Sequence, residues 1–219
     1  MEETYVYVLS WVCVVISIAC QLVGIEICSK IIKKGAGDIS PIPFFAFFIS
    51  ACWWLRYGFM QKISTVIMTN VFGAVLQFIY ITIYYIYSMR KSHVRRLVSI
   101  SLVLLFSPLI YTRFYQLDNK VATQQMGTLC IFVTIVCYAS PLATLTTVVR
   151  TKSCDTISFP LCFMNFLCAV SWVVYGSVID NSYLALPNCT GVILGVVQFG
   201  LFCLYPSSAS RTTTSTSQI

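Results

Sequence analysis

The fold of this chain is decided by residues 168–205, which read CAVSWVVYGSVIDNSYLALPNCTGVILGVVQFGLFCLY. The same plan recurs 118 positions earlier, without a gap, at residues 50–87, SACWWLRYGFMQKISTVIMTNVFGAVLQFIYITIYYIY. Nine of the 38 paired positions are identical: Ala51 with Ala169, Trp54 with Trp172, Tyr57 with Tyr175, Gly58 with Gly176, Ser64 with Ser182, Asn70 with Asn188, Gly73 with Gly191, Leu76 with Leu194 and Tyr87 with Tyr205. Self-similarity at a fixed offset indicates an internal repeat, and it determines how the rest of the chain is interpreted.

The composition is that of a membrane protein. Of the 219 residues, 58% are hydrophobic and only 10% are charged. The apolar residues gather in runs of about 20, the length that a helix needs to cross a bilayer. The net charge of +7 is therefore interpreted as membrane topology and not as a nucleic-acid surface. The eleven cysteines show no metal-ligand spacing, so no zinc site, disulfide or cofactor is expected.

Seven apolar runs are predicted to span the membrane as helices. They lie at about 5–27, 41–60, 65–87, 97–112, 125–149, 157–178 and 183–205. The fourth run is the shortest and weakest, and it carries Pro108. The first run is counted as a spanning helix and not as a cleaved signal peptide, because acidic residues precede it and no small-residue cleavage site follows.

Each copy of the repeat contains three of these runs, and the fourth run has no counterpart. Because three is odd, one extra crossing is needed for the second copy to keep the orientation of the first. We therefore expect an all-α membrane protein of two parallel three-helix repeats joined by a linker helix. The predicted segments are 1–92 for the first repeat, 93–122 for the linker helix, 123–206 for the second repeat and 207–219 for a disordered polar tail.

The basic residues are distributed unevenly between the two sides of the predicted membrane. Ten lie on the side of the C-terminal tail (Lys30, Lys33, Lys34, Arg90, Lys91, Arg95, Arg96, Arg150, Lys152 and Arg211) and four on the other side (Arg56, Lys62, Arg113 and Lys120). Cytoplasmic loops carry the excess of Lys and Arg. The N-terminus is therefore expected outside and the C-terminus in the cytosol.

Motifs in both repeats point to a known family. The first repeat contains WWLRYG at 53–58 and TNVFG at 69–73, and the second contains SWVVYG at 171–176 and LPNCTG at 186–191. Ser140-Pro141 and, a few residues later, the run VVRTKSCDTISFP precede the second pair. Taken together and in this order, the chain resembles the SWEET sugar transporters, the MtN3/saliva type of the PQ-loop superfamily, over nearly its whole length. Parallel repeats are a known arrangement of SWEET proteins.

The resemblance implies a set of site residues. The family's sugar pocket is lined by asparagines of the third and seventh helices and walled by residues of the second and sixth, which here are Asn70, Asn188, Trp54 and Trp172. Family members also carry hinge prolines near the inner ends of four helices. Three of these positions match Pro43, Pro141 and Pro160, whereas the fourth is occupied by Gly24. In lacking this proline the chain is similar to animal members of the family.

The chemistry of these side chains suits a sugar. An asparagine amide offers an acceptor and two donors to hydroxyl groups without a net charge. An indole ring offers a flat apolar face to the C–H side of a sugar, together with an N–H donor. The alternative is that Asn70 and Asn188 only join helices, which is worth about 1 kcal/mol or less per bond in a membrane. Their repetition at equivalent positions, with tryptophan repeated likewise, favours the binding role. Gly73 and Gly191 are expected to be close-packing positions.

The acidic residues predict the transport mode. Glu26 is the only carboxylate expected within a span, and it lies near the inner end. Ion-coupled carriers usually keep a carboxylate at membrane depth, so we expect an uncoupled, bidirectional uniporter that facilitates diffusion by alternating access. No catalytic constellation is present, so the chain is not expected to be an enzyme. The alternatives are a PQ-loop carrier of another small solute, such as an amino acid, and a seven-span receptor.

An outer gate is suggested by two charges at equivalent repeat positions. Lys62 and Asp180 are 118 residues apart and are each predicted in the turn after the second helix of a repeat. We expect them to pair when the outer mouth closes, with Tyr57 and Tyr175 adding hydroxyl contacts. The alternative is that both charges face water.

The expected substrate is inferred from the pocket residues, and the expected location from the family resemblance. Two indoles narrow the predicted pocket, which favours a monosaccharide such as glucose over a disaccharide. The plasma membrane is the family's usual location, with the Golgi or other internal membranes left open. The expected partners are the sugar and the lipid bilayer, with homo-oligomers common among relatives and no nucleic acid.

Overall fold

The structure is a computed structural model that describes residues 2–37, 39–116, 118–155 and 157–205. This part of the chain is helical with short turns, and seven of its segments are long and apolar enough to cross a membrane. The chain divides into two compact units, Met1–Cys137 and Tyr138–Ile219, and each is described by itself. The predicted disordered tail, 207–219, lies outside the described residues, and the predicted segment boundaries remain a prediction.

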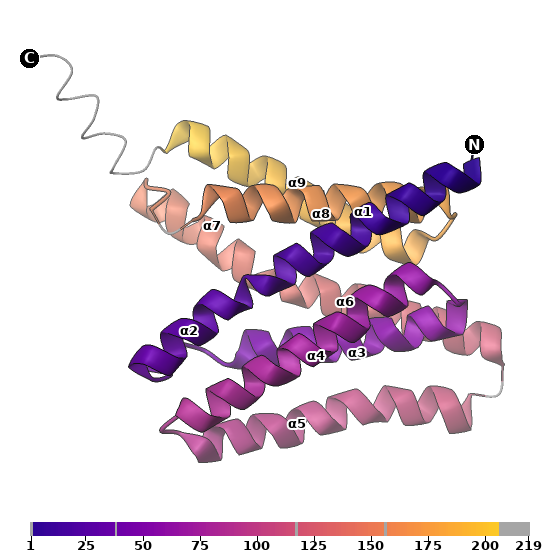
Figure 1. Ribbon diagram of the computed structural model, residues 1–219, viewed down its shortest axis with the longest axis horizontal. Coiled ribbons are helices and arrows are strands. Elements are labelled where there is room, and N and C mark those ends of the chain that lie inside the picture. The colour runs from indigo at the N-terminus through magenta and orange to yellow at the C-terminus, as the bar shows by residue number, and fades with distance from the viewer. Residues whose placement is uncertain (1, 38, 117, 156, 206–219) are drawn as a thin grey trace, which may run out of the picture. The chain divides into compact units, whose positions relative to one another are not determined.

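The first unit is arranged around one central helix (Figure 1). Its elements are α1 (Glu2–Leu22), α2 (Gly24–Lys34), α3 (Ile42–Gln61), α4 (Ser64–Tyr87), α5 (Lys91–Ile110), the π-helical turn η1 (Tyr111–Tyr115) and α6 (Asn119–Cys137). The central helix, α3, packs against α4, α5 and α6, while α1 and α2 pack against α4. The second unit consists of α7 (Ala139–Thr151), α8 (Phe159–Val178) and α9 (Ser182–Leu204), and α9 packs against both of the others.

Four of the predicted runs agree with observed helices to within two residues at each end; these helices are α3, α4, α8 and α9. The other three spans are longer than predicted, at Glu3–Lys34, Lys91–Phe114 and Asn119–Thr151. The prediction of a short fourth helix at about 97–112 was therefore wrong. Apolarity decided the predicted ends, whereas lysine, arginine and glutamine continue a helix well.

The differences between the predicted and the observed helix ends involve polar residues. Basic residues that were predicted in loops lie instead on the last turns of α2 and the first turns of α5; they are Lys30, Lys33, Lys34, Lys91, Arg95 and Arg96. The fifth span begins early because the Asp118 carboxylate accepts hydrogen bonds from the backbone N–H groups of Lys120, at 2.8 Å, and Val121, at 3.3 Å. An aspartate in this place satisfies backbone donors that a helix start would otherwise leave unpaired.

The first span is broken at Val23, between α1 and α2 (Figure 1). Gly24, the first residue of α2, allows the ring of Tyr80 to approach, because a Cβ there would lie 2.8 Å from Tyr80 Cδ2 and closer still to Cε2. The Tyr80 hydroxyl donates to the carbonyl oxygen of Gln21 at 3.2 Å. A carbonyl near the break thus gains a partner from α4, which stabilises the interrupted helix. That the break acts as a hinge remains a prediction.

The predicted hinge prolines all stand in the first turn of a helix. Pro43 is the second residue of α3, Pro160 the second of α8 and Pro141 the third of α7. The fifth span is interrupted just before Pro141, at Tyr138, between α6 and α7. A proline in the first turn removes an N–H that has no partner within the helix, so it fixes where the helix begins at little cost. Their movement during transport remains a prediction.

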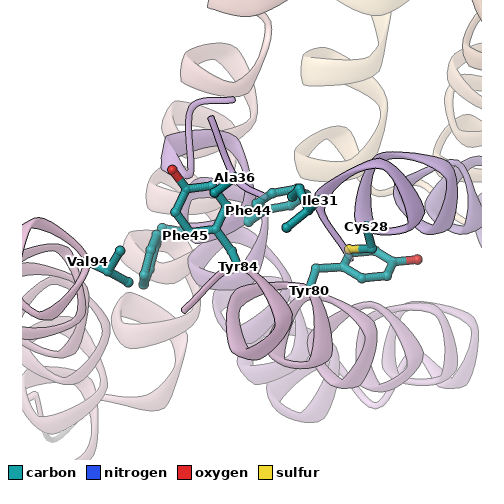
Figure 2. Packing of buried hydrophobic residues seen from close by; sticks show 8 residues of the cluster. All are labelled: Cys28, Ile31, Ala36, Phe44, Phe45, Tyr80, Tyr84 and Val94. Atoms are coloured by element: carbon teal, nitrogen blue, oxygen red, sulfur yellow. The ribbon is translucent and has the colours of Figure 1, made fainter. Parts of the chain in front are cut away.

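A cluster of buried side chains joins α2, α3, α4 and α5 at one end of the first unit (Figure 2). It consists of Cys28, Ile31, Ala36, Phe44, Phe45, Tyr80, Tyr84 and Val94. The Phe44 ring lies 6.0 Å from that of Tyr80 and 6.4 Å from that of Tyr84, centroid to centroid. The Tyr84 hydroxyl donates to the Ile39 carbonyl oxygen at 2.8 Å. This packing fixes the α2–α3 connection to α4.

A smaller cluster of Leu145, Val148, Cys154, Leu194 and Leu201 holds the second unit together. The Cys154 thiol donates to the Leu201 carbonyl oxygen at 3.4 Å. Burial raises the pKa of this thiol, and the neighbouring Asp155 carboxylate raises it further. Cys154 therefore stays protonated at neutral pH and acts as a small hydrophobic residue.

Candidate substrate site

Asn70 lies on α4, and its amide is held by its own helix. Its Nδ2 donates to the Val66 carbonyl oxygen at 2.8 Å and to the Thr69 hydroxyl oxygen at 3.4 Å. Thr69 is 2% exposed, and its hydroxyl donates to the Thr65 or the Val66 carbonyl oxygen, at 2.8 and 3.1 Å. The amide is thus oriented before any ligand arrives, with the Asn70 carbonyl oxygen on the side away from these bonds.

Asn188 has an equivalent bond on α9. Its Nδ2 donates to the Leu184 carbonyl oxygen at 2.8 Å, which is the same four-residue step back along the helix. Pro187 precedes it inside the helix and is fully buried. Both predicted asparagines are half-buried, so each combines a fixed amide with an accessible remainder. Side chains that bond to their own helix in this way are pre-oriented rather than mobile.

Trp54 lies on α3 and is 9% exposed. Its indole Nε1 donates to the Thr134 hydroxyl oxygen on α6 at 3.0 Å, and Thr134 in turn donates to the Cys130 carbonyl oxygen at 2.8 Å. The Tyr57 ring meets the indole edge to face, with centroids 5.6 Å apart and planes at 87°. Thr134 therefore occupies the indole N–H of Trp54, so this group is not free to donate elsewhere.

Trp172 lies on α8 in a comparable environment. Its ring meets Tyr175 edge to face at 5.9 Å and 83°, close to the values of the Trp54–Tyr57 pair. Trp172 is half-buried, whereas Tyr175 is buried. The structure thus brings each predicted tryptophan together with the predicted gate tyrosine of its own repeat. The T-shaped geometry is the favoured one for aromatic pairs and holds both indoles in a defined orientation.

The repeated glycines lie at close contacts. A Cβ on Gly73 would lie 2.9 Å from the Gln21 side-chain oxygen, and one on Gly191 would lie 3.0 Å from the Ala169 Cβ and closer still to the Tyr138 hydroxyl. Gln21 lies on α1, and Tyr138 is the residue just before α7. Each glycine therefore lets a polar side chain from the first span of its repeat approach its helix, which agrees with a packing role.

Lys62 and Asp180 share an unusual backbone conformation. Both are exposed, and both have a positive φ, 57° for Lys62 and 53° for Asp180. The next residue in each case donates its N–H back over the turn, from Ile63 to Gly58 at 3.0 Å and from Asn181 to Gly176 at 2.7 Å. These are the bonds of a Schellman turn, in which a left-handed residue ends a helix. Equivalent turns thus present opposite charges in the two repeats.

Two polar residues beside the site were missed from the sequence, Thr134 and Thr69. A sign of Thr134 was available: the alignment of Pro141 with Gly24 also pairs Thr134 with Ser17, so both repeats carry a hydroxyl there. Thr69 has no such sign, because its counterpart is Pro187. Only the structure shows the hydrogen bonds of Thr69.

Two stretches of the chain, 7–92 and 124–210, match a family model described as "Sugar efflux transporter for intercellular exchange". The sugar transporter SWEET1 of Drosophila pseudoobscura pseudoobscura is 36% identical over 193 residues, covering 84% of this chain and 83% of that protein. The chain belongs to the SWEET family. SWEET1 of Xenopus tropicalis is 32% identical over 203 residues, covering 92% of this chain and 95% of that protein, and SWEET1 of Homo sapiens is 32% identical over 182 residues, covering 81% and 80%.

A solved structure agrees with the fold. It is described as "The 3.7 A resolution structure of a eukaryotic SWEET transporter", and it matches with a TM-score of 0.86 and 23% identity over 93% of this chain and 98% of that chain. The predicted all-α, seven-span membrane fold is thereby confirmed, as is the resemblance drawn from the motifs. SWEET proteins form a family of transporters and not of enzymes.

Proposed function

We propose that this SWEET protein is an uncoupled, bidirectional uniporter of a monosaccharide such as glucose, with Asn70, Asn188, Trp54 and Trp172 binding the sugar. The observation that carries the proposal is the repetition of one local geometry. In each repeat an asparagine donates to the carbonyl four residues before it, and a tryptophan meets a tyrosine edge to face. Pre-oriented amides and fixed indole faces are what recognition of hydroxyls and C–H faces requires.

The proposed lack of ion coupling is supported by the position of Glu26. This carboxylate lies on α2, is exposed, and is paired with Lys30 at 2.8 Å one helical turn away. A coupling carboxylate is expected inside a bundle or a water-filled cavity at membrane depth. Glu26 instead behaves as an ordinary surface residue that stabilises its helix.

The proposed outer gate consists of Lys62 and Asp180, with Tyr57 and Tyr175 nearby in sequence. Support comes from the equivalent left-handed turns that present the two charges. Both tyrosines are buried, and each contacts the tryptophan of its own repeat edge to face, so a movement of either tyrosine would be felt by that indole. Alternating access then links the closing of the outer side to the sugar-binding side chains.

We place the protein in the plasma membrane with the N-terminus outside. This orientation is supported by the excess of basic residues at the ends of α2 and α5, which are exposed. Insertion of a C-terminal and, separately, an N-terminal epitope tag, each probed in intact and permeabilised cells, tests it. Detection of the N-terminal tag only after permeabilisation contradicts the proposed orientation.

Transport by purified protein in liposomes tests the function. Radiolabelled glucose is expected to enter without any ion gradient, and uptake is expected to fall at least tenfold in Asn70→Ala and Asn188→Ala, because each loses polar contacts worth about 1–3 kcal/mol. Asn165→Ala is the matched control, since Asn165 is exposed on α8. Normal uptake by both site variants would refute the site, and uptake of an amino acid in place of glucose would refute the substrate class.

A further inference from the structure

The two asparagines differ in how many amide hydrogens the protein occupies. Asn70 uses both, one on the Val66 carbonyl oxygen and one, at a longer distance, on the Thr69 hydroxyl oxygen. The bond to Val66 fixes which end of the amide is the donor, because a side-chain oxygen placed 2.8 Å from a backbone carbonyl oxygen would repel it. The Asn70 carbonyl oxygen is then the group left to meet a ligand.

Asn188 uses one amide hydrogen in the part of the chain that the structure describes, on the Leu184 carbonyl oxygen. The residue before it is Pro187, which stands where the first repeat has Thr69. Proline has no hydroxyl, so it cannot accept the second amide hydrogen as Thr69 does. The difference between the two asparagines therefore follows from a single repeat position that is Thr in one copy and Pro in the other.

We propose that Thr69 is a positioning residue that restricts Asn70 to accepting hydrogen bonds from the substrate, whereas Asn188 both accepts and donates. The proposal rests on the sugar-binding role of these asparagines given above. Thr69 is suited to this task because it is buried and its own hydrogen is directed to the Thr65 or Val66 carbonyl oxygen. Its oxygen then remains an acceptor for the Asn70 amide, whose Nδ2 lies 3.4 Å away.

As a consequence, the two repeats would make different hydrogen bonds with the sugar, so the sugar would bind in one orientation. A sugar has no two-fold symmetry, whereas paired repeats would offer it two equal amides. With Asn70 restricted to accepting, one sugar hydroxyl has to donate its hydrogen there. Trp54, which is proposed to wall the same pocket, adds no competing donor, because its N–H is bonded to Thr134. The substrate class is thus a hydroxyl compound that donates to one repeat and can accept from the other.

Deoxy and deoxyfluoro sugars distinguish a donating from an accepting hydroxyl. Removing a hydroxyl abolishes both kinds of hydrogen bond, while replacing it by fluorine keeps a weak acceptor of similar size and removes the donor. If a hydroxyl donates to the protein, the two analogues bind equally poorly. If it accepts, the fluorinated analogue binds better than the deoxy one.

The experiment measures how well 2-, 3-, 4- and 6-deoxyglucose and the matching deoxyfluoroglucoses inhibit glucose uptake into proteoliposomes. The hydroxyl read by Asn70 is identified as the one whose removal weakens inhibition of the wild type but no longer matters in Asn70→Ala. At that position we expect both analogues to inhibit about tenfold or more weakly than glucose, and within about twofold of each other.

Substitutions at Thr69 test its part in this pattern. Thr69→Val releases the second amide hydrogen, so the fluorinated analogue is expected to inhibit about threefold better than the deoxy analogue, whereas Thr69→Ser keeps the wild-type pattern. A purely structural role for Thr69 would weaken inhibition by both analogues equally. That result, or a fluorinated analogue that already outperforms its deoxy partner in the wild type, would overturn the proposal, and the wild-type comparison remains decisive if Thr69→Val does not fold.

Failure of the underlying function gives a different result. If Asn70→Ala transports glucose normally, Asn70 does not bind the sugar, and both the site and the inference are refuted. If Asn70→Ala is impaired but the fluorinated analogues inhibit as well as glucose, the site stands and only the restriction to accepting is refuted.

Discussion

Replacing Thr134 by valine should release Trp54 without touching the proposed sugar site directly. The Thr134 hydroxyl accepts the indole N–H at 3.0 Å and donates to the Cys130 carbonyl oxygen at 2.8 Å. Valine keeps the branched shape but has no hydroxyl, so the indole N–H of a residue that is 9% exposed loses its partner. Interhelical hydrogen bonds in membranes are worth about 0.6 kcal/mol on average and at most about 1.7 kcal/mol.

This range sets the expected effect on transport. If the bond stabilises the binding orientation of the indole by about 1 kcal/mol, its loss raises the KM for glucose about fivefold, since 1.4 kcal/mol corresponds to a factor of ten. Glucose uptake into proteoliposomes gives KM, and the thermal stability of the purified protein reports separately on packing. Thr134→Ser keeps the hydroxyl and is the matched control, with both values expected close to wild type.

A double-mutant cycle decides whether the bond itself matters. Trp54→Phe keeps an aromatic ring but removes the N–H, so Thr134→Val should have little further effect on KM in that background. If the two substitutions are additive, or if Thr134→Val has the wild-type KM, then Thr134 does not position Trp54 and the reasoning is refuted.

Three further predictions follow from the same structure. Trp54→Ser should weaken glucose transport and give some transport of sucrose or trehalose, because it opens one wall of the proposed pocket; Trp11→Ser, at an exposed position on α1, is the control, and continued exclusion of every disaccharide with normal glucose uptake would contradict the steric argument. Lys62→Asp or Asp180→Lys should each favour the outward-open state, measured by labelling of an outer cysteine, and the double reversal should restore the wild-type labelling. An exposed ion pair is worth about 0–1 kcal/mol, which is enough to shift the equilibrium between the open and closed states several-fold. If the effects of the two single reversals simply add in the double variant, the two charges do not meet. Lys62→Gly and Asp180→Gly are the matched controls that remove each charge while suiting the left-handed backbone. Gly24→Ala should lower the melting temperature by displacing Tyr80 from the Gln21 carbonyl, at a cost of about 1–3 kcal/mol, and should cost much less in a Tyr80→Ala background; Gly200→Ala, where a Cβ meets nothing within 4 Å, is the control, and an equal loss in both backgrounds would show that Tyr80 is not the obstacle.

The sequence was most informative where a pattern repeats. The identity of Trp54 with Trp172 and Asn70 with Asn188 predicted side chains that the structure shows in equivalent local geometry. The starts of α3 and α8 were also predicted to within two residues, and each of these helices has a proline, Pro43 or Pro160, in its first turn. These helix starts and side-chain geometries depend on residues close in sequence, and they occur in both copies of the repeat.

Features that depend on contacts between distant residues could not be predicted. The break at Val23 is stabilised by Tyr80 from another helix, and the indole N–H of Trp54 is bonded to Thr134, 80 residues away. The ends of α2 and α5 were misplaced because hydropathy marks the bilayer, whereas the helix continues as long as its backbone bonds are satisfied. The hydrogen bond that the Thr69 hydroxyl oxygen accepts from the Asn70 amide could not be predicted either, because a threonine beside an asparagine does not by itself imply such a bond.

Counterflow in liposomes tests the central claim most directly, that the protein is an uncoupled sugar carrier. Liposomes with the purified protein are loaded with unlabelled glucose, diluted into a trace of labelled glucose, and kept at equal pH and equal ion concentrations on both sides. The account predicts that labelled glucose accumulates transiently above its outside concentration, and that Asn70→Ala and Asn188→Ala reduce this accumulation while Asn165→Ala does not. Accumulation that appears only with a proton or sodium gradient, or none with glucose inside, would contradict it.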